Sequence, residues 1–134
     1  MLPFEFVIEG PPVSQQTRRR ARLRAWIEEL KAAITDRWPA DEPPTLGPIR
    51  VIITHIYVEV AVDLDNLAKP VLDALKGLVY QDDGQVTDIS MRKRDLARNL
   101  RIVSPSEMLL DALRHGAEFL HVLVEEAPDQ ELIG

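Results

Sequence analysis

Residues 49–78 have the sequence IRVIITHIYVEVAVDLDNLAKPVLDALKGL, and this stretch decides the fold. Residues 49–62 are rich in β-branched side chains and almost uninterrupted, which predicts one long, buried strand. An acidic motif, Asp63-Leu-Asp65-Asn66-Leu-Ala-Lys69, follows at once. Apolar residues then recur at three- and four-residue spacing, which predicts a helix with one buried face. The stretch therefore predicts a strand and a packed helix, with the acidic motif at their junction.

Four residues predict where this helix starts and ends. Either Asp65 or Asn66 can cap its N-terminus, because a short polar side chain can accept a hydrogen bond from an unpaired backbone N–H. Pro70 has no N–H to donate and is tolerated only near a helix start. Gly77 suits the left-handed conformation that ends many helices. The acidic motif is therefore expected at the helix N-terminus.

The rest of the chain predicts further strands and helices on both sides of this stretch. A mixed sheet with helices packed on it is the natural way to bury them. We therefore expect a single α+β domain over residues 1–134, with residues 125–134 as a loosely held acidic tail. The expected elements are strands over 3–9, 86–91, 100–103 and 119–124, helices near 23–38 and 104–116 (the latter capped by Ser104), a loop over 39–48, and a turn or strand end over 92–99.

The composition is that of an ordinary globular protein. The chain has 134 residues, of which 46% are hydrophobic and 28% charged, enough for one core. It contains no Cys, which excludes a disulfide framework, a thiolate metal site and a cysteine nucleophile. No apolar run approaches the roughly 20 residues of a membrane span. The N-terminus lacks the layout of a signal peptide, so we expect a cytoplasmic protein.

Charge is distributed unevenly along the chain. The net charge of −6 argues against a surface that coats nucleic acid generally. Residues 14–38 nevertheless hold seven cations against three anions, and residues 92–101 hold five against one. The first group opposes the dipole of the helix that it begins, so it either binds phosphate or is a solvated face. The residues predicted to contact DNA are Arg18, Arg19, Arg20, Arg22, Arg92, Lys93 and Arg94.

Four acids within residues 63–83 predict a metal site. Asp63 and Asp65 are two residues apart and can share one face of an extended segment. If the intervening helix folds its far end back to its start, Asp82 and Asp83 can join them. Carboxylates suit Mg²⁺, or Mn²⁺ as a substitute, rather than zinc. With Lys69 one helical turn after Asp65, the pattern predicts metal-dependent hydrolysis of a phosphodiester.

Structural explanations compete with this one. The acids at 63–66 can simply cap a helix, and Asp82-Asp83-Gly84 is a common turn. Asp73 lies four residues after Lys69, so pairing on the helix surface accounts for it. His55, alone on its strand, is expected to be a packed or surface residue rather than a ligand.

Three spaced segments resemble the RusA family of Holliday junction resolvases. The first is the acidic motif at 63–69, the second is Leu72-Asp73-Ala74-Leu75, and the third is Val79-Tyr80-Gln-Asp82-Asp83-Gly-Gln85-Val86. The opening residues 6–12, FVIEGPP, are similar to that family's first strand and turn. The resemblance covers roughly residues 4–103, and the spaced combination is far more specific than either half alone.

The resemblance implies a function. Members of this family are homodimeric, Mg²⁺-dependent endonucleases that nick opposite strands of a four-way DNA junction. By motif position, Asp63, Asp65 and Asp83 match the metal-binding catalytic acids and Lys69 matches the essential lysine. Asp82 and Asn66 match accessory positions.

Two departures keep other interpretations open. Better-known resolvases carry a basic run before the first acid, where this chain has residues 59–62, EVAV, and they are basic overall. The helix near 104–116 also resembles an addition to the family. The alternatives are a metal-dependent nuclease or phosphodiesterase with another substrate, and a non-enzymatic binding module of the kind found in phages.

Overall fold

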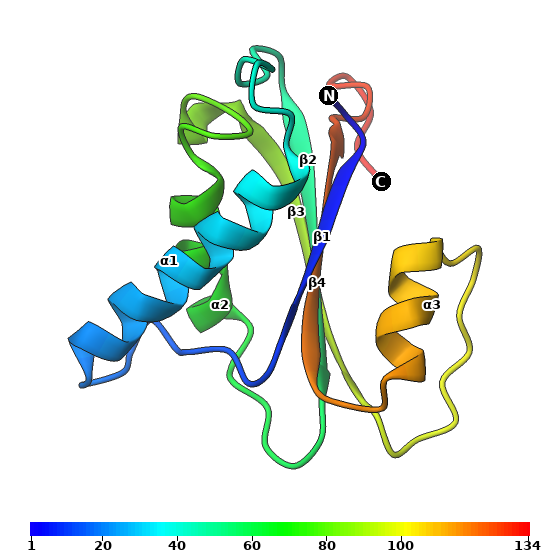
Figure 1. The fold of residues 1–134 in the computed structure, drawn as a ribbon. Coiled ribbons are helices and arrows are strands. Elements are labelled where there is room, and N and C mark those ends of the chain that lie inside the picture. Colours follow the sequence, from blue (N-terminus) through cyan, green and yellow to red (C-terminus); the bar gives the residue numbers. More distant parts are fainter.

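The computed structural model describes residues 1–134 as a four-stranded mixed sheet with helices on both faces (Figure 1). The strand order across the sheet is β1-β4-β2-β3. Helices α1 and α2 lie on one face, and α3 lies on the other. The elements are β1 (Phe4–Glu9), α1 (Arg20–Arg37), β2 (Ile49–Tyr57), α2 (Asp65–Leu75), a 3-10 turn (Asp83–Gln85), β3 (Val86–Asp95), α3 (Glu107–Arg114) and β4 (Phe119–Glu126).

The stretch 49–78 forms the centre of this sheet and the helix that follows. β2 pairs antiparallel with β4, so that Ile53 lies opposite Val122, and parallel with β3, where Ile53 lies opposite Met91. β1 pairs antiparallel with the outer side of β4. Two parallel neighbours need a long crossover connection, and α2 with the turn after it supplies that connection. The expected α+β domain with a mixed sheet is confirmed.

Most of the core lies between the sheet and helices α1 and α2. Alternate residues of β2, namely Ile49, Val51 and Ile53, are fully buried on this face, as period-two alternation requires. Leu30 and Ile34 of α1 are also fully buried there. A smaller apolar cluster on the opposite face lies under α3. No helix is long and apolar enough to cross a membrane.

Two strand boundaries differ from the prediction. β2 ends at Tyr57 rather than at residue 62, because neither neighbouring strand offers a partner beyond that point. Val58 and Val60 are accordingly exposed. β3 extends to Asp95 rather than 91, because it pairs with β2 as far as Tyr57. The strand predicted over 100–103 was wrong, since those residues form a loop.

The start of α3 also differs from the prediction. Ser106, not Ser104, is the N-cap, and its hydroxyl oxygen accepts a hydrogen bond from the Leu109 N–H at 3.1 Å. The same hydroxyl donates to Glu5 at 2.9 Å, which attaches the helix start to β1. The hydrogen bond to Glu5 of β1 distinguishes Ser106 from Ser104 as the cap. At the C-terminus, β4 includes Glu125 and Glu126, two residues that were predicted to belong to the tail.

Candidate active site

The two acids of the motif lie exposed at the N-terminal end of α2. Asp65 is the first helical residue, and Asp63 lies just before it, with the Asn66 N–H donating to the Asp63 carbonyl at 3.0 Å. The predicted capping role was wrong. The N-cap is Leu64, and no side chain makes a capping hydrogen bond there. Because capping does not occupy them, the two carboxylates are available to bind a ligand.

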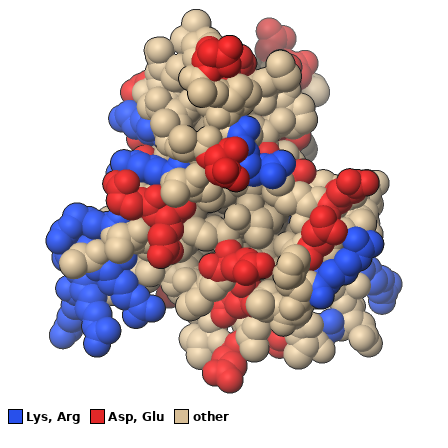
Figure 2. Space-filling model, viewed as in Figure 1, with Lys and Arg blue, Asp and Glu red and all other residues tan.

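A backbone hydrogen bond attaches the loop just before α1 to this motif. Pro70 lies in mid-helix and cannot donate to the Asn66 carbonyl, which would otherwise stay unpaired. The Gln15 N–H fills that place at 3.0 Å. The Arg20 guanidinium in turn donates to the Gln15 carbonyl at 2.7 Å. Basic side chains gather over this end of α1 (Figure 2), so the arginine group begins beside the acidic motif.

Lys69 is held as a cation one turn further along α2. Its ammonium group donates to the Asp73 carboxylate at 2.7 Å, an i,i+4 pair as the spacing predicts. The hydrogen bond and the charge of Asp73 raise the pKa of Lys69, and the charge of Asp83 raises it further. Asp83 is therefore near enough to act on Lys69 electrostatically. A lysine with a raised pKa stays protonated near neutral pH, which suits charge stabilisation rather than proton abstraction.

Asp82 has a structural role in the turn before β3. Its carboxylate accepts a hydrogen bond from the Gly84 N–H at 3.0 Å, and the Gln85 side chain accepts one from the Asp82 N–H at 3.0 Å. Together these bonds form a capping box. The carboxylate of Asp82 is thus engaged within the turn, which leaves Asp83 as the acid presented by this segment.

Gln85 anchors this turn, a role that we did not predict from the sequence. Its amide nitrogen donates to the Thr45 carbonyl at 2.7 Å and to the Gly47 carbonyl at 2.9 Å. The turn is therefore attached to the proline-rich loop over 39–48. The sequence signal was present in the family motif, where Gln85 follows the two acids.

Tyr80 orients Asp83 toward α2, which the sequence did not predict either. Its fully buried side chain places the hydroxyl 2.9 Å from an Asp83 carboxylate oxygen and 3.1 Å from the Leu72 carbonyl. Burial raises the pKa of Tyr80 most, and the hydrogen bond and charge of Asp83 raise it further. The hydroxyl therefore remains a donor. Lys76 lies 3.9 Å from the other Asp83 oxygen, so a tyrosine and a lysine both hold this acid.

Removing the Tyr80 hydroxyl tests this interaction. We expect Tyr80→Phe to lower the free energy of unfolding by about 1 kcal/mol at neutral pH, because the variant lacks a part-buried hydrogen bond. Because folding raises the pKa of Tyr80, the direction in which this stabilisation changes with pH follows. The stabilisation is fully present below the usual tyrosine pKa of about 10 and is lost as pH rises above it, because unfolded Tyr80 then ionises first.

Urea unfolding of both proteins at about pH 7 and about pH 10.5 measures this prediction. The stability difference between them should shrink at the higher pH. Tyr57→Phe is the matched control, since Tyr57 is only partly buried and its hydroxyl makes no hydrogen bond within the chain. A difference that stays constant across this pH range would contradict the assigned hydrogen bond.

The predicted convergence of the acids is not seen in the structure. No group of three or more His, Cys, Asp or Glu side chains lies close enough to hold a metal ion. Asp63 and Asp65 lie at the start of α2, and Asp83 lies beside Lys76 near its other end. The Tyr80 hydroxyl holds the Asp83 carboxylate near the Leu72 carbonyl, about two helical turns after Asp65. The donor type still suits a hard cation, since all three carboxylates are exposed.

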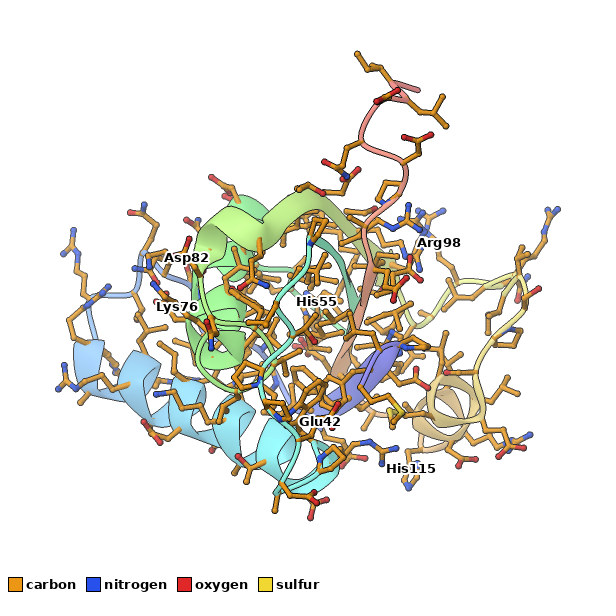
Figure 3. The ribbon with its side chains drawn as sticks, turned by 90° about the horizontal axis from the view of Figure 1, so that it is seen from above. Glu42, His55, Lys76, Asp82, Arg98 and His115 are labelled. Carbon is orange, nitrogen blue, oxygen red and sulfur yellow. The ribbon has the colours of Figure 1, made fainter.

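Arg92 and Arg94 of β3 lie across the sheet from these acids, whereas Lys93 between them points to the face that α1 and α2 cover. Arg92 lies opposite Thr54 of β2 and donates to its hydroxyl at 2.8 Å. Figure 3 shows Lys76 and Asp82 together beside α2, and Arg98 on the far side of the sheet. Of the two arginine-rich segments, the one at the start of α1 is therefore the one on the same side of the sheet as the acidic motif. His55 is a packed residue, as predicted, with its ring 2.7 Å from Glu118.

Comparison with known proteins identifies the family. The family described as Endodeoxyribonuclease RusA matches residues 10–103, which is more than half of the chain. No curated protein matches this chain. The family consists of endonucleases that act on DNA phosphodiester bonds and resolve Holliday junctions, generally with a divalent metal. On this match, the chain belongs to the RusA endodeoxyribonuclease family.

Proposed function

We propose that this protein is a Mg²⁺-dependent, structure-selective endonuclease that resolves four-way DNA junctions by paired nicks. The observation that carries the proposal is the family motif, whose acids and lysine lie exposed along one helix and the turn that follows it. Asp63, Asp65 and Asp83 are the proposed catalytic acids, and Lys69 is the proposed cation. Asp82 and Asn66 support the local backbone.

The three acids are the groups that would hold the metal. Mg²⁺ is proposed rather than zinc, because all the donors are carboxylate oxygens and the chain has no Cys. When bound, a divalent cation supplies an activated water and stabilises the charge that develops on the phosphate. Since the three acids are apart in the structure, metal binding requires Asp83 to approach the start of α2.

Lys69 and the start of α2 would act on the phosphate itself. The raised pKa keeps Lys69 positively charged, so it can stabilise negative charge on a phosphate oxygen. The dipole of α2 favours an anion at the same end of the helix. Nearby, the exposed arginines at the start of α1 are proposed to hold the DNA backbone.

Paired nicks need two active sites in a fixed relation. A dimer with two-fold symmetry presents two identical sites to opposite strands of a junction. We therefore propose a homodimer. A single subunit carries one copy of the motif and can account for only one nick.

The function is tested by cleavage of a labelled four-way junction beside a linear duplex of the same sequence, at low salt and with Mg²⁺. Low salt matters because phosphate contacts weaken steeply as salt rises. We expect symmetric nicks in the junction only, and no nicks when EDTA replaces Mg²⁺. Equal cutting of the junction and the duplex would contradict structure selectivity.

A second candidate is a metal-dependent nuclease with another substrate. It is favoured by the acidic net charge of −6 and by residues 58–62, which carry no cation just before the first acid. Single-stranded and flapped DNA in the same assay separate the two candidates. Faster cutting of either substrate than of the junction would favour this second one.

A further inference from the structure

A second basic site lies on the face of the sheet that α3 covers. A cavity of about 450 Å³ lies between β3, the loop over 96–103 and α3. The family match ends at residue 103, so α3, which forms one wall of the cavity, lies outside it. The residues that define the site are Arg92, Arg94, Arg98 and Arg101, with Thr54 and Leu109 beside them.

Strand register places the first two arginines. Arg92 and Arg94 are two residues apart on β3, where they lie opposite Thr54 and Ile56 of β2. Alternate residues of a strand point to the same face, so both reach the α3 side. The Arg92 Nε donates to the Thr54 hydroxyl at 2.8 Å. This bond orients the guanidinium and leaves its two terminal nitrogens free to donate to a ligand.

Apolar anchors place the other two arginines. The Leu96 N–H donates to the Tyr57 carbonyl at 2.9 Å, which attaches the loop to the end of β2. Leu96 and Leu100 pack against the small apolar cluster under α3. Arg98 and Arg101 flank the second anchor and are exposed. The loop is therefore fixed by its leucines while its arginines face solvent.

The four arginines have no acidic partner. Elsewhere in the chain, Arg50 donates to Glu125 at 2.8 Å, and Arg114 donates to Asp111 at 3.0 Å. None of the four cavity arginines forms an ion pair with a carboxylate. Four cations that line one hollow repel one another, and a bound anion would relieve that repulsion.

Acids near the cavity are already engaged. A neighbouring cavity of about 410 Å³ on the same face shares Arg92 and contains Glu5, Glu125 and His121. Glu5 accepts a hydrogen bond from Ser106 at 2.9 Å and pairs with the His121 ring at 2.7 Å. Glu125 forms an ion pair with Arg50, which lies opposite it on the neighbouring strand β2. These acids therefore do not neutralise the arginine site.

We propose that this cavity binds a phosphate group of the DNA backbone. A guanidinium fork matches phosphate oxygens with two parallel hydrogen bonds, so an arginine cluster favours phosphate over a single point charge. The inference rests on the proposed action on branched DNA. Because the sheet separates Arg98 from the side that carries Lys76 and Asp82 (Figure 3), the bound phosphate belongs to DNA that leads away from the nick.

The test is the binding of a labelled four-way junction by the full chain in EDTA, where no cleavage interferes. The variant carries Arg98→Gln and Arg101→Gln. The matched control carries Arg37→Gln and Arg114→Gln, which remove the same charge from exposed positions outside the cavity. We expect roughly tenfold weaker binding in the cavity variant than in the control, because charged hydrogen bonds to phosphate are removed. The slope of log K against log salt should fall by about 1 for each phosphate that the variant no longer neutralises.

Two outcomes would overturn the inference. One is equal junction affinity in the cavity variant and the control, with both folded by circular dichroism. The other is found by titration with inorganic pyrophosphate. If the wild type and the control bind pyrophosphate, the cavity variant does not, and the junction affinity of the cavity variant is nevertheless unchanged, the cavity binds a free phosphate compound rather than DNA. Binding in EDTA does not depend on cleavage, so failure of the proposed nuclease activity is distinguishable from failure of this site.

Discussion

Asp65→Asn is expected to slow Mg²⁺-dependent cleavage of a four-way junction by about a thousandfold or more, because it removes a charged oxygen donor from the proposed metal site. The fold should be unaffected. Asp65 is exposed and its side chain makes no capping hydrogen bond, so the substitution removes only the small interaction of its charge with the helix dipole. Initial nicking rates under single-turnover conditions, with thermal unfolding in parallel, measure both parts.

Asp36→Asn is the matched control for this substitution. Asp36 is an exposed residue near the end of α1, and the change removes the same charge. The control should cut at the wild-type rate. An undiminished rate in Asp65→Asn would remove this residue from the active site and with it the proposed metal site.

Lys69→Gln is expected to lower the cleavage rate by roughly 10²–10³-fold, the usual cost of removing one group that stabilises transition-state charge. Lys69→Arg, which keeps the charge, should retain more activity than Lys69→Gln. Because the pKa of Lys69 is raised, its charge persists into alkaline solution. The wild-type rate should therefore not fall between about pH 7 and about pH 9 through loss of this charge.

Junction affinity in EDTA shows whether Lys69 acts on the chemical step. Binding by Lys69→Gln should stay close to that of Lys31→Gln, a control on α1 remote from the motif. A rate that falls only in proportion to affinity would assign Lys69 to DNA binding instead. Equal activity in the Gln and Arg variants would exclude charge as its contribution.

Local patterns were enough to predict most of the elements. The apolar spacing of α2, its C-terminal Gly77 and its Lys69–Asp73 pair all appear in the structure as predicted. These features depend on residues within about one turn of each other, so periodicity and side-chain spacing carry the information. The family motif is likewise visible in the sequence alone, and the comparison confirmed the family.

Contacts between distant segments decided what the sequence could not. β2 stops at Tyr57 because neither partner strand has residues that pair beyond this point, although the apolar pattern continues. Ser106 rather than Ser104 caps α3 because Glu5 of β1 binds it. The first choice depends on strand pairing and the second on a side-chain contact between distant segments, and no local window contains either.

The same division applies to the candidate site. The sequence by itself predicted which residues carry chemistry: three acids, a lysine one turn after Asp65 and two arginine-rich segments. Only the tertiary structure decided their arrangement. It places Asp83 against Tyr80 and keeps it apart from Asp65. It also places the two arginine groups on opposite sides of the sheet, because β3 presents its arginines to the face opposite α2.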